Sequence, residues 1–144
     1  MTRAAFSNAI DNSKNVPGIP AARYLSQLKG NFLEKGDRLR NLYVSFESDY
    51  TFRQENAFTG YDTETPTPGY WLINASIGTD VMCKGKTLFT INLSGTNLTD
   101  VAYQNHLSRL KYTAINSVTG RQGVFNVGRS FAIKVNVPLS FKWK

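Results

Sequence analysis

Side chains that commonly carry chemistry are sparse in this sequence. The 144 residues include one histidine, His106, and one cysteine, Cys83. This composition excludes an intrachain disulfide, a thiolate metal site and a multi-histidine metal site. No Gly-x-Ser-x-Gly turn and no phosphate-binding Walker loop occurs in the sequence. We therefore predict that the chain is not an enzyme, has no catalytic residue and binds no cofactor or metal.

Two carboxylates have a spacing that acid–base chemistry could use. Glu47 and Asp49 lie two residues apart, which places both on the same face of a β-strand. Such a pair can exchange protons with a substrate. A polar strand face that lines water accounts for them better, because the residues around them alternate in the same way.

Alternation of apolar and polar residues dominates the rest of the chain and predicts β-strands. The last sixteen residues, RSFAIKVNVPLSFKWK, alternate from Phe131 to Trp143 almost without a break. The segments 39–53, 70–82 and 87–96 alternate as clearly, whereas 22–32 and 3–10 do so more weakly. We expect an all-β fold, an antiparallel meander of about six long strands without a convincing helix.

The links between these strands alternate in length. Residues 33–37 and 83–86 form short, glycine-containing turns, and residues 11–20, 54–69 and 99–123 form long loops. Short turns alternating with long loops are typical of outer-membrane β-barrels, whose strands also exceed the usual five or six residues. Aromatic residues gather near the expected strand ends, as in the two aromatic girdles of such barrels. The pattern therefore favours strands that belong to a transmembrane β-barrel.

The charge does not indicate a nucleic-acid partner. The net charge is +7, but no run of five basic residues occurs, so solvated turns and strand faces explain the basic residues better.

No apolar run approaches the roughly 20 residues of a membrane-spanning helix. The segment MTRAAFSNAI lacks the apolar stretch of a secretory signal. The chain is therefore expected to be either cytoplasmic or part of something longer.

Two stretches resemble a known family. NLSGTNLTDVAYQNHLSRLKY (92–112) is similar to the strand-and-loop signature near the C-terminus of TonB-dependent outer-membrane receptors, and here the signature residues are Asn97, Leu98, Asp100 and Tyr103. TGRQGVFNVGRSFAIKVNVPL (119–139) resembles the final turn and strand that follow. VPGIPAARYL and TPGYWLINASIG are similar to earlier strand openings, particularly in Bacteroidetes-like bacteria. Asn97 and Asp100 are expected to cap the backbone where a strand ends, with Tyr103 as an anchor.

The resemblance implies a 22-stranded barrel around an N-terminal plug. Such receptors take up iron complexes, vitamins or glycans, with energy passed from TonB. Residues 1–144 would be the C-terminal portion of the barrel, without plug or N-terminal strands, located in the outer membrane and not competent for transport alone. The implied partners are outer-membrane lipid, the barrel-assembly machinery, the TonB complex through the absent N-terminal part, and a transported ligand.

The family topology also implies roles for particular residues. It places the loop 99–123 outside the cell, where His106, Arg109, Lys111 and Tyr112 are candidate ligand contacts for an anionic or metal-chelating substrate. A loop that only packs on its neighbours is the alternative. Phe141 and Trp143 are the candidate terminal aromatics for barrel assembly, although the chain ends one residue later, at Lys144.

A second class of function stays open at this point. A soluble β-barrel or sandwich, either lipocalin-like or oligonucleotide-binding, would also alternate apolar and polar residues. That fold would be closed and stable without detergent, and its apolar residues would face one another.

Overall fold

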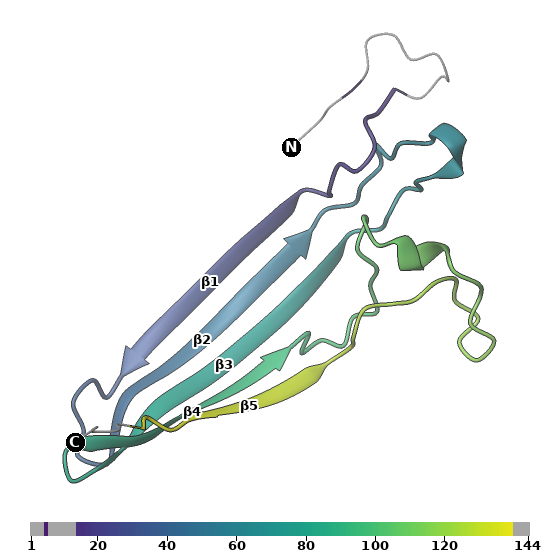
Figure 1. The fold of residues 1–144 in the computed structure, drawn as a ribbon. Helices are drawn as coiled ribbons and strands as arrows, with labels where there is room; N and C mark the ends of the chain where they lie inside the picture. The colour runs from purple at the N-terminus through teal and green to yellow at the C-terminus, as the bar shows by residue number, and fades with distance from the viewer. Residues whose placement is uncertain (1–4, 6–13, 140–144) are drawn as a thin grey trace, which may run out of the picture. The chain divides into compact units, whose positions relative to one another are not determined.

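The computed structural model describes residue 5 and residues 14–139, and within them five strands form one sheet (Figure 1). The sheet is an antiparallel meander in which neighbouring strands are consecutive in sequence, and it does not close on itself. The strands are β1 (Arg23–Phe32), β2 (Leu39–Thr51), β3 (Tyr70–Cys83), β4 (Lys86–Thr96) and β5 (Ser130–Asn136). This confirms the predicted all-β meander.

Among the described residues the helices are two single turns. They are η1 (Gly60–Asp62) and η2 (Arg109–Tyr112), each inside one of the long loops. Over residues 14–139, no helix has the length and apolar character that crossing a membrane would require.

At the chain ends, one expected strand lies outside the described residues and another is shorter than expected. The expected first strand, 3–10, falls almost entirely outside the described residues, so the described sheet has five strands and not about six. The last strand ends at Asn136, seven residues before the expected position. Pro138 has no N–H to continue the ladder, which explains an end near that position. Phe141 and Trp143 lie outside the described residues.

The predicted alternation of links is confirmed. Lys84 and Gly85 connect β3 to β4 with positive φ angles of 48° and 78°, the combination that a two-residue type I′ hairpin requires. Six residues join β1 to β2, whereas long loops join β2 to β3 and β4 to β5. The two short turns therefore lie at one set of strand ends and the two long loops at the other.

The strand register places the apolar residues of β3, β4 and β5 on one face. Ile77, Leu93 and Ile133 are direct partners across the three strands, and direct partners point to the same side of a sheet. The row beside it consists of Thr79, Ile91 and Val135. The apolar face predicted from the alternation is therefore continuous across these strands.

Side-chain hydrogen bonds cover the opposite face. The hydroxyl of Thr90 donates to Oδ1 of Asp80 at 2.6 Å, and the hydroxyl of Tyr43 donates to Oδ1 of Asn92 at 3.0 Å. Two further bonds join β2 to β3. They link Ser45 to Ser76 at 2.7 Å and Asn74 to Glu47 at 2.7 Å. The polar face is thus a network in which Glu47 has a structural partner.

Burial in this sheet is the reverse of that in a soluble domain. On the described strands the buried apolar side chains are Leu72 and Met82, and the buried polar ones are Ser45, Asp49 and Thr51. Large apolar side chains on the strands are open, with Phe131 75% and Ile133 72% exposed. Soluble proteins bury such residues and expose polar ones. The apolar face therefore lacks the contacts that would cover it.

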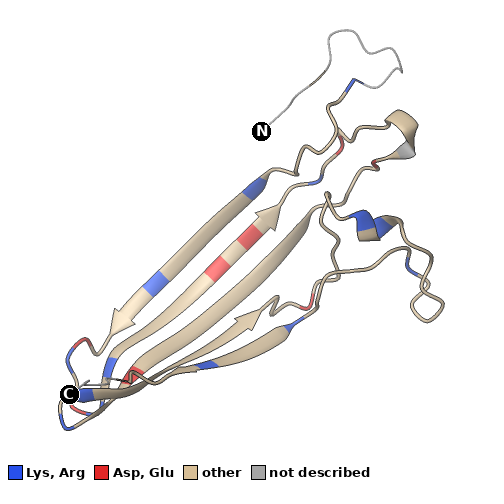
Figure 2. Ribbon diagram, viewed as in Figure 1, with Lys and Arg blue, Asp and Glu red and all other residues tan. Residues whose placement is uncertain are grey.

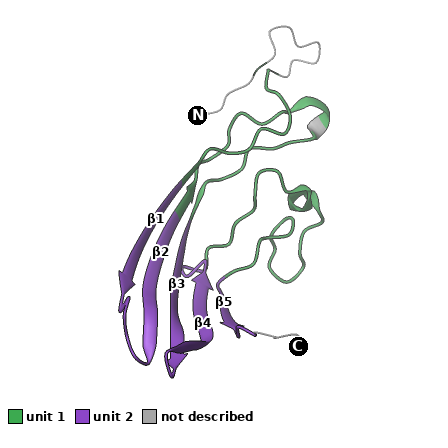
Figure 3. Cartoon of the chain, turned by 60° about the vertical axis from the view of Figure 1, so that its left-hand side comes forward, with its two compact units in different colours: residues 1–24, 49–71, 101–128 green, residues 25–48, 72–100, 129–144 purple. Residues whose placement is uncertain are grey.

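The chain divides into two compact units (Figure 3). Unit 1 consists of residues 1–24, 49–71 and 101–128, and contains both helical turns. Unit 2 consists of residues 25–48, 72–100 and 129–144, and contains most of the sheet. Figure 2 shows charged residues in the turns and loops and as separate bands on β1, β2 and β5, while most of the β3 ribbon carries none.

A glycine in β3 makes room for the polar network. A Cβ on Gly78 would lie 2.5 Å from Cε1 of Tyr43 and 2.3 Å from Oδ1 of Asn92. The tyrosine ring therefore lies against the bare backbone of β3 and reaches β4 with its hydroxyl. Nζ of Lys29 lies 4.4 Å from the centroid of the same ring, within the range of a cation–π contact.

This packing gives a stability prediction. Gly78→Ala should lower the free energy of unfolding by about 1–3 kcal/mol, because the added methyl forces Tyr43 and Asn92 apart. Chemical denaturation followed by circular dichroism measures this change. In a Tyr43→Ala background the same substitution should cost less, since the ring is gone. Equal costs in the two backgrounds would show that the clash does not govern this position.

Candidate functional site

The signature residues form a corner that ends β4. The backbone N–H of Asn97 donates to Oδ1 of Asn74 at 2.9 Å, and the N–H of Leu98 donates to the carbonyl of Ile73 at 2.8 Å. Asn97 and Asp100 both have positive φ, at 49° and 55°. Asparagine and aspartate tolerate this conformation better than other non-glycine residues, which is why these residue types suit the turn.

Asp100 then holds the start of β5. Its Oδ1 accepts the backbone N–H of Arg129 at 2.8 Å, and its Oδ2 lies 3.9 Å from the Arg129 guanidinium. This bond is the side-chain cap expected for Asp100. Leu98 covers Gly95, where an added Cβ would lie 2.6 Å from the leucine Cδ2. The corner therefore fixes both the end of β4 and the strand that pairs with it.

The anchor residue of the signature lies in unit 1. The Tyr103 ring packs on that of Tyr70 with centroids 4.3 Å apart, and its carbonyl accepts the N–H of Asn126 at 2.9 Å. Tyr103 thus joins the start of the long β4–β5 loop to its end.

The Asp100 cap can be tested by substitution. Asp100→Ala should destabilise the β4–β5 pairing by about 1–2 kcal/mol, because it leaves the Arg129 N–H without its acceptor. Asp100→Asn keeps an acceptor oxygen and should lose much less. Amide exchange of β5 residues measures the effect. Equal protection in the two variants would contradict a capping role.

A cavity of about 760 Å³ lies within unit 1. Three segments line it, around residues 17–18, 58–64 and 106–112. His106, Arg109 and Tyr112, which the sequence singled out, all lie on its wall. The loop that was expected to contact a ligand therefore forms a concave surface with residues from the preceding long loop.

A buried hydrogen-bond network supports this cavity. Nζ of Lys111 donates to Oγ1 of Thr67 at 2.7 Å and to the carbonyl of Thr65 at 3.0 Å. Oγ1 of Thr67 also lies 2.8 Å from Nδ1 of His106. Lys111 is 6% exposed and His106 is 4% exposed. The hydrogen bond between Thr67 and Nδ1 therefore fixes the orientation of the imidazole ring.

Glu64 is held rigidly on the other side of the imidazole. Its Oε1 accepts the N–H of Gly18 at 2.6 Å and its Oε2 accepts the N–H of Phe58 at 3.0 Å. Nε2 of His106 lies 3.6 Å from Oε2 of Glu64, beyond hydrogen-bond distance. Among the described residues, this buried Nε2 has no hydrogen-bond partner.

Burial sets the ionisation of this pair. Burial lowers the pKa of His106 below 6.5, and the charge of Lys111 lowers it further, against the opposing effect of Glu64. For Glu64, burial favours the protonated form, but the N–H groups of Phe58 and Gly18 and the proximity of His106 outweigh it and lower the pKa below 4.5. At neutral pH the site therefore contains a neutral imidazole and a carboxylate.

These pKa shifts predict that acid loosens unit 1. A histidine with a lowered pKa resists protonation in the fold, so stability is complete above pH 6.5 and falls as the pH drops below it. A glutamate with a lowered pKa adds stability that disappears below pH 4.5. Hydrogen exchange of residues 103–126, corrected for intrinsic rates, should show both losses. His106→Asn should remove the first; an unchanged profile in that variant would contradict the assignment.

One predicted ligand contact lies outside the cavity lining. Lys111 does not line the cavity, because its ammonium is buried against Thr65 and Thr67. Its backbone is closely covered as well, since a Cβ on Gly123 would lie 2.4 Å from the Lys111 carbonyl oxygen. Glu64 and Phe58, which the sequence analysis missed, take part in the wall instead. They lie in the preceding long loop, and no spacing signal connects them to His106.

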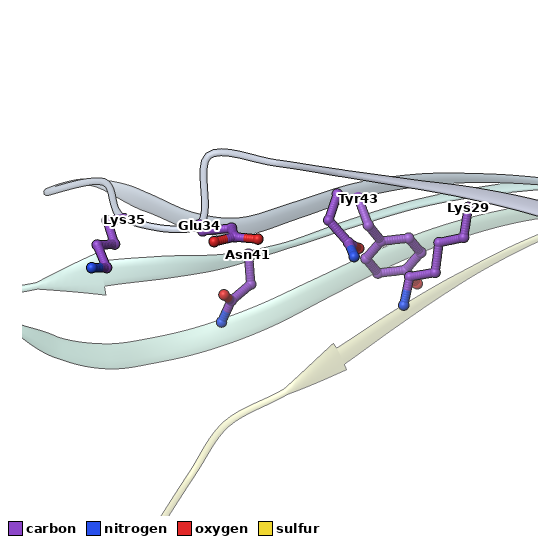
Figure 4. A pocket seen from close by; sticks show the side chains of 6 residues that line it. Lys29, Glu34, Lys35, Asn41 and Tyr43 are labelled. Atoms are coloured by element: carbon purple, nitrogen blue, oxygen red, sulfur yellow. The ribbon is translucent and has the colours of Figure 1, made fainter.

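A second cavity of about 490 Å³ lies in unit 2, at the β1–β2 hairpin. Figure 4 shows its side chains, with Lys29 beside the Tyr43 ring and with Glu34 and Lys35 near the turn. Asn41 also lines it and donates to Oδ2 of Asp80 at 2.7 Å. Two lysines, one glutamate, two asparagines and one tyrosine line it, so it is a polar, partly charged cavity.

In comparisons with protein-family models, curated proteins and solved structures, nothing matches this chain.

Proposed function

We propose that residues 1–144 are the C-terminal portion of the β-barrel of a TonB-dependent outer-membrane receptor, which takes up a scarce ligand. In this proposal the five strands cross the outer membrane and the long loops lie on the outside. The portion described would not transport by itself, because it contains neither plug nor gate. The TonB complex would act through other parts of the parent protein.

The reversed burial of the sheet is the observation that carries the proposal. One face joins its strands by polar side-chain hydrogen bonds, while the other exposes residues such as Leu93, Phe131 and Ile133. In a membrane barrel the polar face lines a water-filled interior and the apolar face contacts lipid. Each face would then have the surroundings that its side chains require.

The free edges of the sheet give further support. β1 and β5 each pair with one neighbour in the described sheet. Unpaired edges promote aggregation in soluble proteins, whereas barrels remove them by closure. Further strands of a parent barrel would pair with both edges.

The soluble alternative is less well supported. A lipocalin-like or oligonucleotide-binding module would turn its apolar rows inward and close around them. Here the apolar row of β5 is open, with Val135 54% exposed, and the sheet does not close. The resemblance of the corner residues Asn97, Leu98, Asp100 and Tyr103 to the receptor signature also favours the barrel.

Fractionation of the producing cells tests the proposal. An antibody raised against this chain should detect, in the outer-membrane fraction, a polypeptide much longer than 144 residues. An inner-membrane protein and a cytoplasmic protein serve as fractionation controls. Detection of a 144-residue polypeptide in the soluble fraction would overturn the proposal.

A further inference from the structure

We propose that an apolar groove of about 470 Å³ on unit 2 holds one acyl chain of a membrane lipid with a phosphoethanolamine head group. This role rests on the proposed barrel, in which the apolar face of the sheet lies in lipid. The groove has the volume of a small-molecule site, about 300–1,000 Å³. Nine of its eleven lining residues are apolar, and the other two are Ser76 and Ser94. Its lining therefore suits a hydrocarbon chain.

Two small residues account for the groove. Ala75 of β3 and Gly95 of β4 are direct partners, and direct partners lie on the same side of a sheet. The next pair on that side consists of larger residues, Ile77 and Leu93, and Ile133 extends the row onto β5. All five residues line the groove. The step from large to small side chains leaves a hollow in the apolar face.

The corner that ends β4 bounds the groove. Leu98 and Phe131 both line it, and a Cβ on Gly95 would lie 2.6 Å from Cδ2 of Leu98 and 3.2 Å from Cδ1 of Phe131. Asp100 follows Leu98 by two positions, and Arg129 precedes Phe131 by two positions. The end of the groove that is nearest the long loops therefore lies beside the Asp100–Arg129 pair.

This pair of charges can receive a zwitterionic head group. The side chains of Arg129 and Asp100 are 50% and 56% exposed, and their charged atoms are 3.9 Å apart, which is longer than a hydrogen bond. The guanidinium can therefore still donate to phosphate oxygens, and the carboxylate can accept a hydrogen bond from a primary ammonium. A phosphoethanolamine group carries both charges. A purely anionic head group would be repelled by the Asp100 carboxylate.

The groove and the charged pair together select a lipid. A lipid joins an acyl chain covalently to its head group, so one molecule can occupy the groove and contact both charges. A soluble phosphoethanolamine would leave the groove empty, and an uncharged lipid would leave the charged pair unused. In the proposed barrel, lipids surround this face, so the ligand is present at high local concentration.

Native mass spectrometry of the full chain tests the proposal. The chain is released from detergent micelles that contain phosphatidylethanolamine, phosphatidylglycerol and diacylglycerol in equal amounts and with the same acyl chains. Ala75→Phe fills the groove, and Val135→Phe adds a ring to the same face outside the lining residues. Arg129→Gln and Asp100→Asn each remove one charge at the head-group site. Lys134→Gln is the control for loss of a charge on β5.

We expect each chain to retain one phosphatidylethanolamine, about tenfold more than diacylglycerol. Ala75→Phe should abolish the retention of all three lipids. Arg129→Gln should remove the preference over diacylglycerol, and Asp100→Asn should remove the preference over phosphatidylglycerol. Val135→Phe and Lys134→Gln should behave like the unsubstituted chain. Equal retention of the three lipids, or retention that Ala75→Phe does not change, would overturn the proposal.

Circular dichroism with and without micelles reports on the barrel separately. A chain that folds only in micelles but shows no lipid preference contradicts the lipid site alone. A chain that folds in plain buffer and still retains phosphatidylethanolamine contradicts the membrane location alone. A second copy of the chain over the groove would appear as a dimer that Ala75→Phe dissociates, and this result would also overturn the lipid site.

Discussion

Leu93→Arg should weaken the stable insertion of this chain into lipid vesicles by about 2–4 kcal/mol, the cost of an arginine near the middle of a barrel's lipid-facing surface. Leu93 lies two residues from the midpoint of β4, between Ile77 and Ile133 on the apolar face, and is 43% exposed. In the proposed barrel this position lies in hydrocarbon. Denaturant titration of the vesicle-inserted chain, followed by circular dichroism, measures the change.

The next residue provides a matched control. Asn92 lies on the polar face of the same strand, and its Oδ1 accepts the Tyr43 hydroxyl. Asn92→Arg should lose that one hydrogen bond, at a cost of about 1 kcal/mol. The introduced guanidinium would stay in contact with water. Equal costs for the two arginines would show that the two faces do not differ in their surroundings. A larger cost for Asn92→Arg would show that the two faces are assigned the wrong way round.

Lys111→Met should loosen the loop network of unit 1 by about 2 kcal/mol. The substitution keeps an unbranched apolar stem but removes the ammonium that bonds Thr65 and Thr67, and a buried acceptor without a donor costs about 1–3 kcal/mol. Loss of this support should also release the ring of His106. Amide exchange at Thr67, whose N–H donates to Gln54, measures the effect.

Lys14→Met controls for the loss of a positive charge, since Lys14 is exposed in the same unit. It should leave the exchange at Thr67 unchanged. Equal exchange in Lys111→Met and in the unsubstituted chain would show that Lys111 is a surface charge with no structural role. It would then again be a candidate for the ligand contact that the sequence analysis expected.

Strands could be predicted well because their signal is local. The alternation in 39–53, 70–82 and 87–96 depends on residues two apart, and the corresponding strands begin and end within about three residues of these segments. The error at the C-terminal strand has an equally local cause. Alternation continues through Pro138, but a proline cannot supply the N–H that the ladder needs.

The candidate site could be predicted only in part. His106, Arg109 and Tyr112 belong to one loop, and their polar and aromatic character indicated a binding surface. Glu64 lies 42 positions before His106 in another loop, so only the fold brings the two together. The burial of Lys111 could not be predicted for a similar reason, because it depends on a threonine 44 positions away.

The central claim is that the apolar face contacts lipid, and a cysteine scan of β4 tests it most directly. With Cys83 changed to serine, single cysteines at Phe89, Thr90, Ile91, Asn92, Leu93 and Ser94 are labelled with a fluorophore in vesicles that contain brominated lipid. We predict strong quenching at Phe89, Ile91 and Leu93 and weak quenching at Thr90, Asn92 and Ser94. Uniform quenching, or quenching confined to the polar positions, would contradict it.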